Sequence, residues 1–319
     1  MFTNYHYFLV LAEEGSISRA AERLFVTHQC LSKYISNLET EYGVTLFERK
    51  PVFTLTYAGK LMLEALRQAE SIHINLKNQY ADLQKNLAGE VHIGTTEGRF
   101  RILMPDIISD FKQAFPAVQL RISSAPSPEL IKMVQQNRLD LIVANSTEKM
   151  RHTLATREVL REKIYFVISD AMLEEYLPER YPQCKEEFRQ GVDLRLFQQV
   201  PVALNMPNFN SHIILDRHLE QIGAKLNCIH TSSHPDLHHL MSARDYAASF
   251  CLTMYLPNLL RLIQESRGRL NVFPILDLYE TNPVAIAYVK KRIFPHYTDV
   301  LMRIIRRRCQ EFKKYDLKV

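Results

Sequence analysis

One segment near the N-terminus carries polar side chains at a spacing that suits DNA recognition. Gln29, Ser32, Lys33 and Ser36 recur at i, i+3, i+4 and i+7, so a helix would place them on one face. Amides and hydroxyls can hydrogen-bond to base edges in the major groove, and a lysine can bind phosphate. The opposite face of the same helix is apolar and consists of Leu31, Ile35, Leu38 and Tyr42. The pattern predicts a recognition helix, although the solvated face of a small helical bundle would have the same spacing.

The rest of the sequence shows no pattern typical of catalysis or metal binding. Neither GxSxG nor GxxxxGK[ST] occurs, and the five cysteines are scattered without a CxxC, which favours buried free thiols. His234 and His238 are at i and i+4, with Asp236 and His239 nearby, but no third ligand has a recognisable spacing. A solvated helix face is therefore the preferred interpretation of these histidines. We expect no catalytic residues, no cofactor and no metal.

Two further helices and a hairpin should hold the recognition helix in place. An apolar stripe at Tyr5–Ala12 predicts a first helix, and Ser16 or Ser18 can cap a second one. Thr27 is the expected N-cap of the recognition helix. Val52–Thr56 should be a strand of a β wing. A helix, a short turn and a polar-faced helix together make a helix-turn-helix.

Four blocks occur in order within the first sixty residues: SISRAAERL at 16–24, LSKYISNLE at 31–39, GVTLFER at 43–49 and LTYAG at 55–59. These blocks resemble the N-terminal module of LysR-type transcriptional regulators. The resemblance implies a winged helix-turn-helix that binds double-stranded DNA as a dimer. It places the following residues at the DNA: Thr27, His28, Gln29, Ser32, Lys33, Ser36, Arg49, Lys50 and Thr56. The family usually has Gln-Pro where this chain has His28-Gln29, and the wing of this chain is short.

A long helix should follow, because residues 58–87 contain no proline and their apolar positions repeat alternately every four and three residues. This seam consists of Met62, Leu66, Ala69, His73, Leu76, Tyr80, Leu83 and Leu87. A helix with one apolar seam needs a partner, which could be a second copy of the chain or the chain's own C-terminal domain. The family resemblance favours a homo-oligomer, a dimer or a tetramer, that pairs through this helix.

From residue 89 onward strands alternate with helices, which predicts a parallel sheet covered by helices. The predicted fold class is α/β, with an N-terminal winged helix-turn-helix, a long linker helix and a C-terminal effector domain. The resemblance implies that this last domain has two Rossmann-like lobes, as in periplasmic binding proteins. The expected divisions are 1–57 for DNA binding, 58–88 for the linker and 89–319 for the effector domain, with lobe I at about 89–162 and 268–319 and lobe II at about 163–267. Residues 170–193 look like an inserted helix.

Ligands of such a two-lobed sheet bind beyond the C-terminal ends of the strands, beside helix N-termini. The expected effector-binding residues are Thr95, Thr96, Arg99, Ser127, Asn145, Ser146, Met206, Asn208 and Thr231. Hydroxyls and helix N-termini favour a small anion, and Arg99 or Arg101 could add positive charge. Where the family commonly has a glycine-rich turn, this chain has Arg244–Ala248, so a vestigial pocket is an alternative.

The composition is ordinary for a globular protein of about two domains, with 319 residues of which 46% are hydrophobic and 24% charged. The chain has no run of 18 or more apolar residues and no secretory signal, so we expect a cytoplasmic protein. The net charge of +5 comes from the C-terminal end and does not by itself argue for nucleic acid. Together these observations favour a DNA-binding regulator. The alternative is a small-molecule enzyme or binding protein that uses its N-terminal module only to dimerise.

Overall fold

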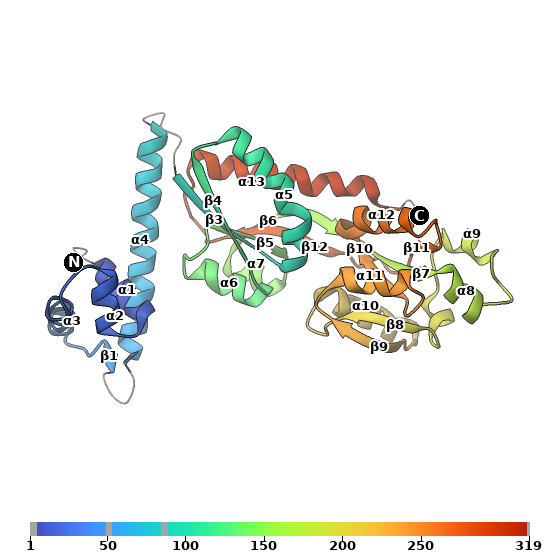
Figure 1. The fold of residues 1–319 in the computed structure, drawn as a ribbon, viewed down its shortest axis with the longest axis horizontal. Coiled ribbons are helices and arrows are strands. Elements are labelled where there is room, and N and C mark those ends of the chain that lie inside the picture. The colour runs from blue at the N-terminus through green and yellow to red at the C-terminus, as the bar shows by residue number, and fades with distance from the viewer. Residues whose placement is uncertain (1–4, 49–52, 84–88, 318–319) are drawn as a thin grey trace.

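The structure is a computed structural model, and it describes residues 5–48, 53–83 and 89–317. Figure 1 shows a small helical unit and one long helix at one end of an elongated molecule, beside two α/β lobes. No helix within these described ranges is long and apolar enough to cross a membrane. The chain runs from the helical unit through the long helix into the first lobe, crosses to the second lobe and then returns to the first.

The N-terminal unit packs three helices against a short hairpin. Its elements are α1 (Tyr5–Glu14), α2 (Ile17–Arg23), α3 (His28–Tyr42), β1 (Phe47–Glu48) and β2 (Thr54–Leu55), and α4 (Tyr57–Leu83) follows them. The two strands pair antiparallel as a wing. Two helix caps are those predicted, since Ser16 Oγ accepts from the Arg19 amide at 3.5 Å and Thr27 Oγ1 accepts from the Cys30 amide at 3.2 Å. The predicted winged helix-turn-helix is confirmed.

The core of this unit is made from the apolar stripes of its helices. One cluster holds the buried side chains Phe8, Leu11, Leu31, Ile35 and Phe47. Because Leu31 and Ile35 turn inward, the face of α3 on the other side of the helix is directed outward. The packing of the core thus fixes which residues of α3 a bound molecule can reach.

The seam of α4 is divided between two roles. Leu66 is buried in the N-terminal unit, and Met62 packs against the same cluster. Further along the helix, Ile72 and Leu76 are 69% and 42% exposed. The side chains of Tyr80 and Leu83, and all of Leu87, lie outside the described part of the chain. The beginning of the seam therefore holds the N-terminal unit onto α4, whereas its middle faces outward.

The first lobe is built on a five-stranded sheet of order β4-β3-β5-β12-β6. The strands are β3 (Gly89–Thr95), β4 (Val118–Ser124), β5 (Leu141–Asn145), β6 (Ala155–Glu162) and β12 (Asn282–Tyr288). β3 runs parallel to β4 and β5, whereas β12 is antiparallel to both β5 and β6. The predicted parallel pairing therefore holds for β3, β4 and β5, whereas β12 adds antiparallel pairs because the chain returns from the second lobe in the opposite direction. The helices of this lobe are α5 (Glu97–Ala114), α6 (Ser127–Gln135), α7 (Glu148–Thr153) and α13 (His296–Glu311).

The second lobe contains two small sheets. An antiparallel sheet of order β10-β7-β11 consists of β7 (Ile164–Ser169), β10 (Ser249–Leu252) and β11 (Leu270–Pro274). A parallel pair consists of β8 (Pro201–Asn205) and β9 (Asn227–Ser232). The helices are α8 (Asp170–Tyr176), α9 (Cys184–Phe188), α10 (Asn210–Ile222), α11 (Pro235–Ala243) and α12 (Leu256–Glu265), and short 3-10 turns lie at Leu194–Phe197, Thr253–Tyr255 and Phe312–Tyr315.

Two segments of this lobe bear on the expected divisions. Residues 170–193 contain the two short helices α8 and α9 rather than one inserted helix. β11, which lies where the chain was expected to return to the first lobe, pairs with β7. Leu270 and Val272 of β11 pack in the cluster that includes residues of α5 and α13, whereas Phe273 packs in the core of the second lobe.

The sheet containing β7 also connects the cores of the two lobes. Tyr165 and Val167 on one face of β7 belong to the cluster that includes residues of α5 and α13. Phe166 and Ile168, on the other face, belong to the core of the second lobe. Because side chains alternate along a strand, β7 serves both cores at once. A continuous apolar layer therefore runs from one lobe into the other.

Candidate functional site

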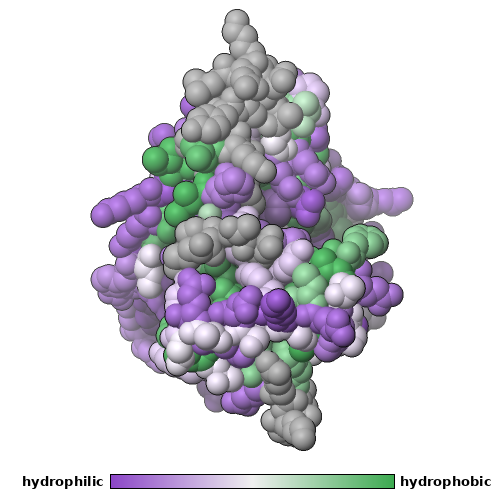
Figure 2. Space-filling model, turned by 90° about the vertical axis from the view of Figure 1, so that its left-hand side faces the viewer, coloured by the Kyte–Doolittle hydropathy of each residue, from purple (hydrophilic) through white to green (hydrophobic). Residues whose placement is uncertain are grey.

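The polar face of α3 lies on the outside of the N-terminal unit. His28, Gln29, Lys33 and Ser36 are exposed, and Ser32 is half-buried with its Oγ 3.5 Å from His28 Nδ1. Lys33 forms no ion pair with any residue that the structure describes. Figure 2 looks onto this end of the molecule, where hydrophilic residues cover most of the surface. Five of the predicted DNA-binding residues are thus brought together on one accessible helix face.

The other predicted DNA-binding residues are placed differently. The hydroxyl of Thr27 caps α3. Thr56 Oγ1 donates to the Thr45 carbonyl at 2.7 Å and accepts from the Gly59 amide at 3.0 Å, so it joins the wing to α4. Both hydroxyls therefore hold the reading unit together. Arg49 and Lys50 lie outside the described residues.

The turn between α2 and α3 contains a residue that the sequence did not single out. Phe25 is 96% exposed, and its backbone has φ of 55°, in the left-handed region. Its neighbours Leu24 and Val26 pack against the core. A run of three apolar residues reads as core, and only the fold reveals that the middle one points outward.

A buried polar network lies at the C-terminal ends of β3 and β5. Arg99 Nη2 donates to Glu162 Oε2 at 2.7 Å and to Asn145 Oδ1 at 2.6 Å. Asn282 Nδ2 donates to the same two oxygens, at 2.8 Å and 3.2 Å. Asn210, on the first turn of α10, donates through Nδ2 to Asn282 Oδ1 at 2.6 Å, which links the second lobe to the first.

The network is almost completely closed off from solvent. Arg99 is 6% exposed, and Glu162 and Asn282 are 0% exposed. Arg99 Nε and Glu162 Oε1 are buried atoms that have no hydrogen-bond partner among the described residues. The hydroxyl of Tyr255, whose pKa is raised by burial, lies beside Gly98 on α5, one residue from Arg99. Polar side chains at the strand ends are thus engaged with one another.

The predicted effector residues divide into those near this network and those apart from it. Asn145 and Arg99 belong to it, Thr96 Oγ1 accepts weakly from Arg99 Nη1 at 3.4 Å, and Thr95 Oγ1 donates to the Val143 carbonyl at 3.1 Å. Within the described part of the chain, five other predicted residues form no hydrogen bond with the network: Ser127, Ser146, Met206, Asn208 and Thr231. Arg101 pairs instead with Glu97 on the surface of α5.

Ser127, which the Ser-Pro-Glu sequence at 127–129 suggests as a helix N-cap, does not cap a helix. Ser127 is the first residue of α6, and Pro126 occupies the N-cap position without a side-chain hydrogen bond. The helix begins one residue early because the ring of Pro126 already fixes the backbone dihedral that precedes a helix. Ser127 therefore has no capping role.

Glu162, Asn282 and Asn210 are the network residues that sequence reasoning missed. Glu162 ends β6, Asn282 begins β12 and Asn210 begins α10. A single charged residue at the end of a strand, such as Glu162 in β6, is only a weak sequence signal of a buried site. These three residues come into contact only because the chain crosses from the first lobe to the second and back.

The histidines of α11 are not on a solvated face, so that prediction is wrong. His238 and His239 are buried, and His238 Nε2 lies 2.8 Å from Ser232 Oγ. The pKa of both residues is lowered to about 4, chiefly by burial, and in His238 also by the neighbouring His239, His230 and His234. Within the part of the chain that the structure describes, no group of three His, Cys, Asp or Glu side chains could hold a metal ion.

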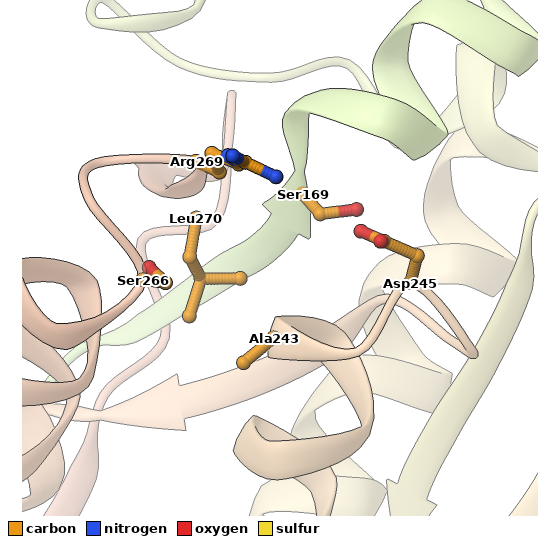
Figure 3. A pocket seen from close by; sticks show the side chains of 6 residues that line it. All are labelled: Ser169, Ala243, Asp245, Ser266, Arg269 and Leu270. Carbon is orange, nitrogen blue, oxygen red and sulfur yellow. The ribbon is translucent and has the colours of Figure 1, made fainter.

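Two hollows lie away from the network. One, of about 170 Å³, is lined by Ser169, Ala243, Asp245, Ser266, Arg269 and Leu270. Figure 3 shows the side chains of Ser169 and Asp245 directed toward one another above Ala243. The other hollow, of about 550 Å³, lies at residues 198–199 and 225–228. Neither is lined by the predicted effector residues.

Comparisons with known proteins agree with this arrangement of parts. Residues 2–60 match the family described as bacterial regulatory helix-turn-helix protein, lysR family, and residues 84–310 match the LysR substrate binding domain. YtlI of Bacillus subtilis strain 168, an HTH-type transcriptional regulator, is 23% identical over 312 residues. That match covers 97% of this chain and 94% of YtlI.

Solved structures share the whole fold. Full-length OxyR from Pseudomonas aeruginosa superposes with a TM-score of 0.67 at 20% identity, covering 94% of this chain and 92% of OxyR. Full-length CbnR in complex with its target DNA has a TM-score of 0.58 at 15% identity, covering 95% of this chain and 97% of CbnR. The similarity extends from the reading unit to the end of the second lobe.

Proposed function

Since the chain belongs to the LysR family of transcriptional regulators, we propose that α3 reads a twofold DNA site and that the Arg99 network marks the place where an effector acts. The protein is a DNA-binding transcriptional regulator with an effector-binding domain, and it is not an enzyme. We propose which residues contact DNA, how two copies of the chain pair, and where the effector binds.

The observation that carries the DNA proposal is the outward polar face of α3. Gln29 is exposed near the N-terminal end of the helix, where a recognition helix contacts bases, and its amide can pair with adenine. Lys33 is exposed and free of ion pairs with described residues, so its charge is available to a phosphate. CbnR, whose solved complex contains its target DNA, supports the same use of this unit.

We propose that two copies pair through α4. Ile72 and Leu76 leave an apolar strip on the outside of this helix, beyond the part that packs on its own reading unit. A second α4 would cover that strip and would set two reading units on a twofold site. A regulator of this kind works on the chromosome, so we place it in the cytoplasm.

We propose that the effector acts between the lobes, at the ends of β3 and β5. Asn210 of the second lobe bonds to Asn282 of the first at this point, so a ligand here would change the contacts between lobes. A ligand that binds one arrangement of the lobes better than another shifts the population toward it and can alter the spacing of the reading units. The expected contacts are Thr96, Arg99 and Asn145.

The experiment that tests this function measures DNA affinity at several salt concentrations. Lys33→Ala should weaken all DNA binding and lower the slope of log affinity against log salt by about 1. Gln29→Ala should lower the free energy of binding to the specific site by about 1–3 kcal/mol more than it lowers that of binding to nonspecific DNA. Lys149→Ala, an exposed lysine on α7, is the matched control and should change neither quantity. An unchanged affinity and slope for Lys33→Ala would refute the assignment of α3.

A further inference from the structure

The charge of Arg99 is already balanced inside the protein. Its Nη2 atom uses both of its hydrogens, one on Glu162 Oε2 at 2.7 Å and one on Asn145 Oδ1 at 2.6 Å. Asn282 Nδ2 donates to the same two oxygens, so two donors and two acceptors form a closed arrangement. The carboxylate of Glu162 therefore stands where the carboxylate of a bound anion would stand on Arg99.

We propose that Glu162 is a tethered anion that keeps anionic ligands off Arg99, so that the effector of this protein is an uncharged molecule that both donates and accepts hydrogen bonds. This inference rests on the proposed effector site at the strand ends. It reverses the expectation of a small anion, which counted Arg99 as a free positive charge.

Burial explains why an anion does not displace Glu162. The side chain is 0% exposed, and it ends β6 just before the chain crosses to the second lobe. A carboxylate held in this position is tethered to the strand and cannot leave Arg99 for solvent without opening the contact between the lobes, and a buried charge without its partner is strongly unfavourable. An incoming anion would leave two negative groups beside one guanidinium, whereas a neutral ligand leaves the pair intact.

The atoms left over in the network indicate the class of ligand. Arg99 Nε is a buried donor and Glu162 Oε1 is a buried acceptor, and no residue in the described part of the chain supplies a partner to either. Buried polar atoms of native proteins are normally hydrogen-bonded. A hydroxyl or a primary amide offers one acceptor and at least one donor, which matches this pair, whereas a carboxylate offers acceptors only.

Chemical rescue tests the tethered anion directly. Glu162→Ala removes the carboxylate and leaves space for acetate, so sodium acetate should raise the Tm of the full-length variant saturably, by about 2–4 °C or more, relative to sodium chloride at equal ionic strength. Wild type should show no such acetate effect. Glu158→Ala, an exposed residue on the same strand that pairs with Arg161, is the matched control and should behave as wild type.

Glu162→Gln keeps the shape of the side chain and gives a second variant should the alanine variant fail to accumulate. Its Tm should fall below that of wild type, and acetate should not restore it, because the amide occupies the space. Saturable stabilisation of wild type by acetate would overturn the proposal, because Arg99 would then be open to anions. Equal rescue of the alanine and glutamine variants, or no rescue of either, would also overturn it.

The ligand class is tested on wild type with pairs of compounds that differ only in charge, acetate with acetamide and benzoate with benzamide. The amide should raise Tm more than the acid in any pair that binds, and a greater effect of the acid would contradict the inference. DNA binding is measured on the same samples. If wild type does not bind DNA specifically, the proposed function is contradicted. The acetate and amide results would still test the inference about Glu162, because they depend only on the cleft.

Discussion

Tyr255 fills the space beside Gly98, so that an ideal β-carbon at residue 98 would overlap Tyr255 Oη and lie 3.0 Å from Cζ. Gly98 is on the first turn of α5, one residue before Arg99, and Tyr255 comes from the second lobe's side of the shared core. The absence of a side chain at residue 98 thus lets the tyrosine ring close over the network.

The first prediction follows from that contact. Gly98→Ala should lower the free energy of unfolding by about 1–3 kcal/mol, because either α5 or the tyrosine must move. Tyr255→Phe in the same chain should recover part of this loss, since it removes the hydroxyl that overlaps most. Urea unfolding of both single variants and the double variant measures the coupling. Strict additivity of the two changes would show that these residues do not meet.

The sequence predicted elements better than it predicted contacts between them. The first helix and the polar face of α3 follow from local periodicity, and the structure has both. Glu162 and Asn282 are 120 residues apart, and no periodicity brings them together. The burial of His238 and His239 likewise depends on how α11 packs against the sheets, because the side of the helix with Leu237 and Leu240 is left exposed instead.

The second prediction concerns acid. His238 and His239 have a pKa of about 4 in the folded protein, below the ordinary value of 6.5 for histidine, so the unfolded chain binds protons more readily. Their contribution to stability is complete above about pH 6.5 and is lost as the pH falls toward 4, on the order of 1–3 kcal/mol for each residue.

This dependence is measured as Tm between pH 7 and pH 4. His239→Phe should flatten the profile, because an aromatic ring of similar breadth replaces a buried group that takes up a proton on unfolding. His152→Gln, which changes an exposed histidine on α7, is the control and should leave the profile as in wild type. A profile for His239→Phe as steep as that of wild type would be inconsistent with the role of burial.

The third prediction concerns the turn of the reading unit. Phe25 is 96% exposed with φ of 55°, so its side chain contributes little to the core while its backbone is strained. Phe25→Asn should raise the free energy of unfolding by about 1 kcal/mol, because asparagine adopts the left-handed conformation more readily. Tyr57→Asn, at another exposed aromatic residue, should give no such gain. Equal or opposite effects of the two changes in urea unfolding would count against strain at residue 25.

The fourth prediction concerns the long helix. Leu76→Asp should raise the dissociation constant of the dimer at least tenfold, equivalent to about 1.4 kcal/mol, because it places a charge in the apolar strip. Leu61→Asp alters another exposed leucine on α4, outside the seam, and should have a smaller effect. Sedimentation velocity over a range of protein concentrations distinguishes them. If Leu76→Asp dimerised as wild type does, the interface would have to be sought elsewhere.

The central claim is that α3 reads DNA as part of a twofold assembly. The most direct test is selection of genomic DNA fragments by the purified full-length protein, followed by footprinting of the selected fragments at two salt concentrations. We predict a protected site with twofold symmetry that persists at the higher salt and is lost in Gln29→Ala combined with Lys33→Ala. Weak binding without sequence preference that disappears with salt would contradict the account.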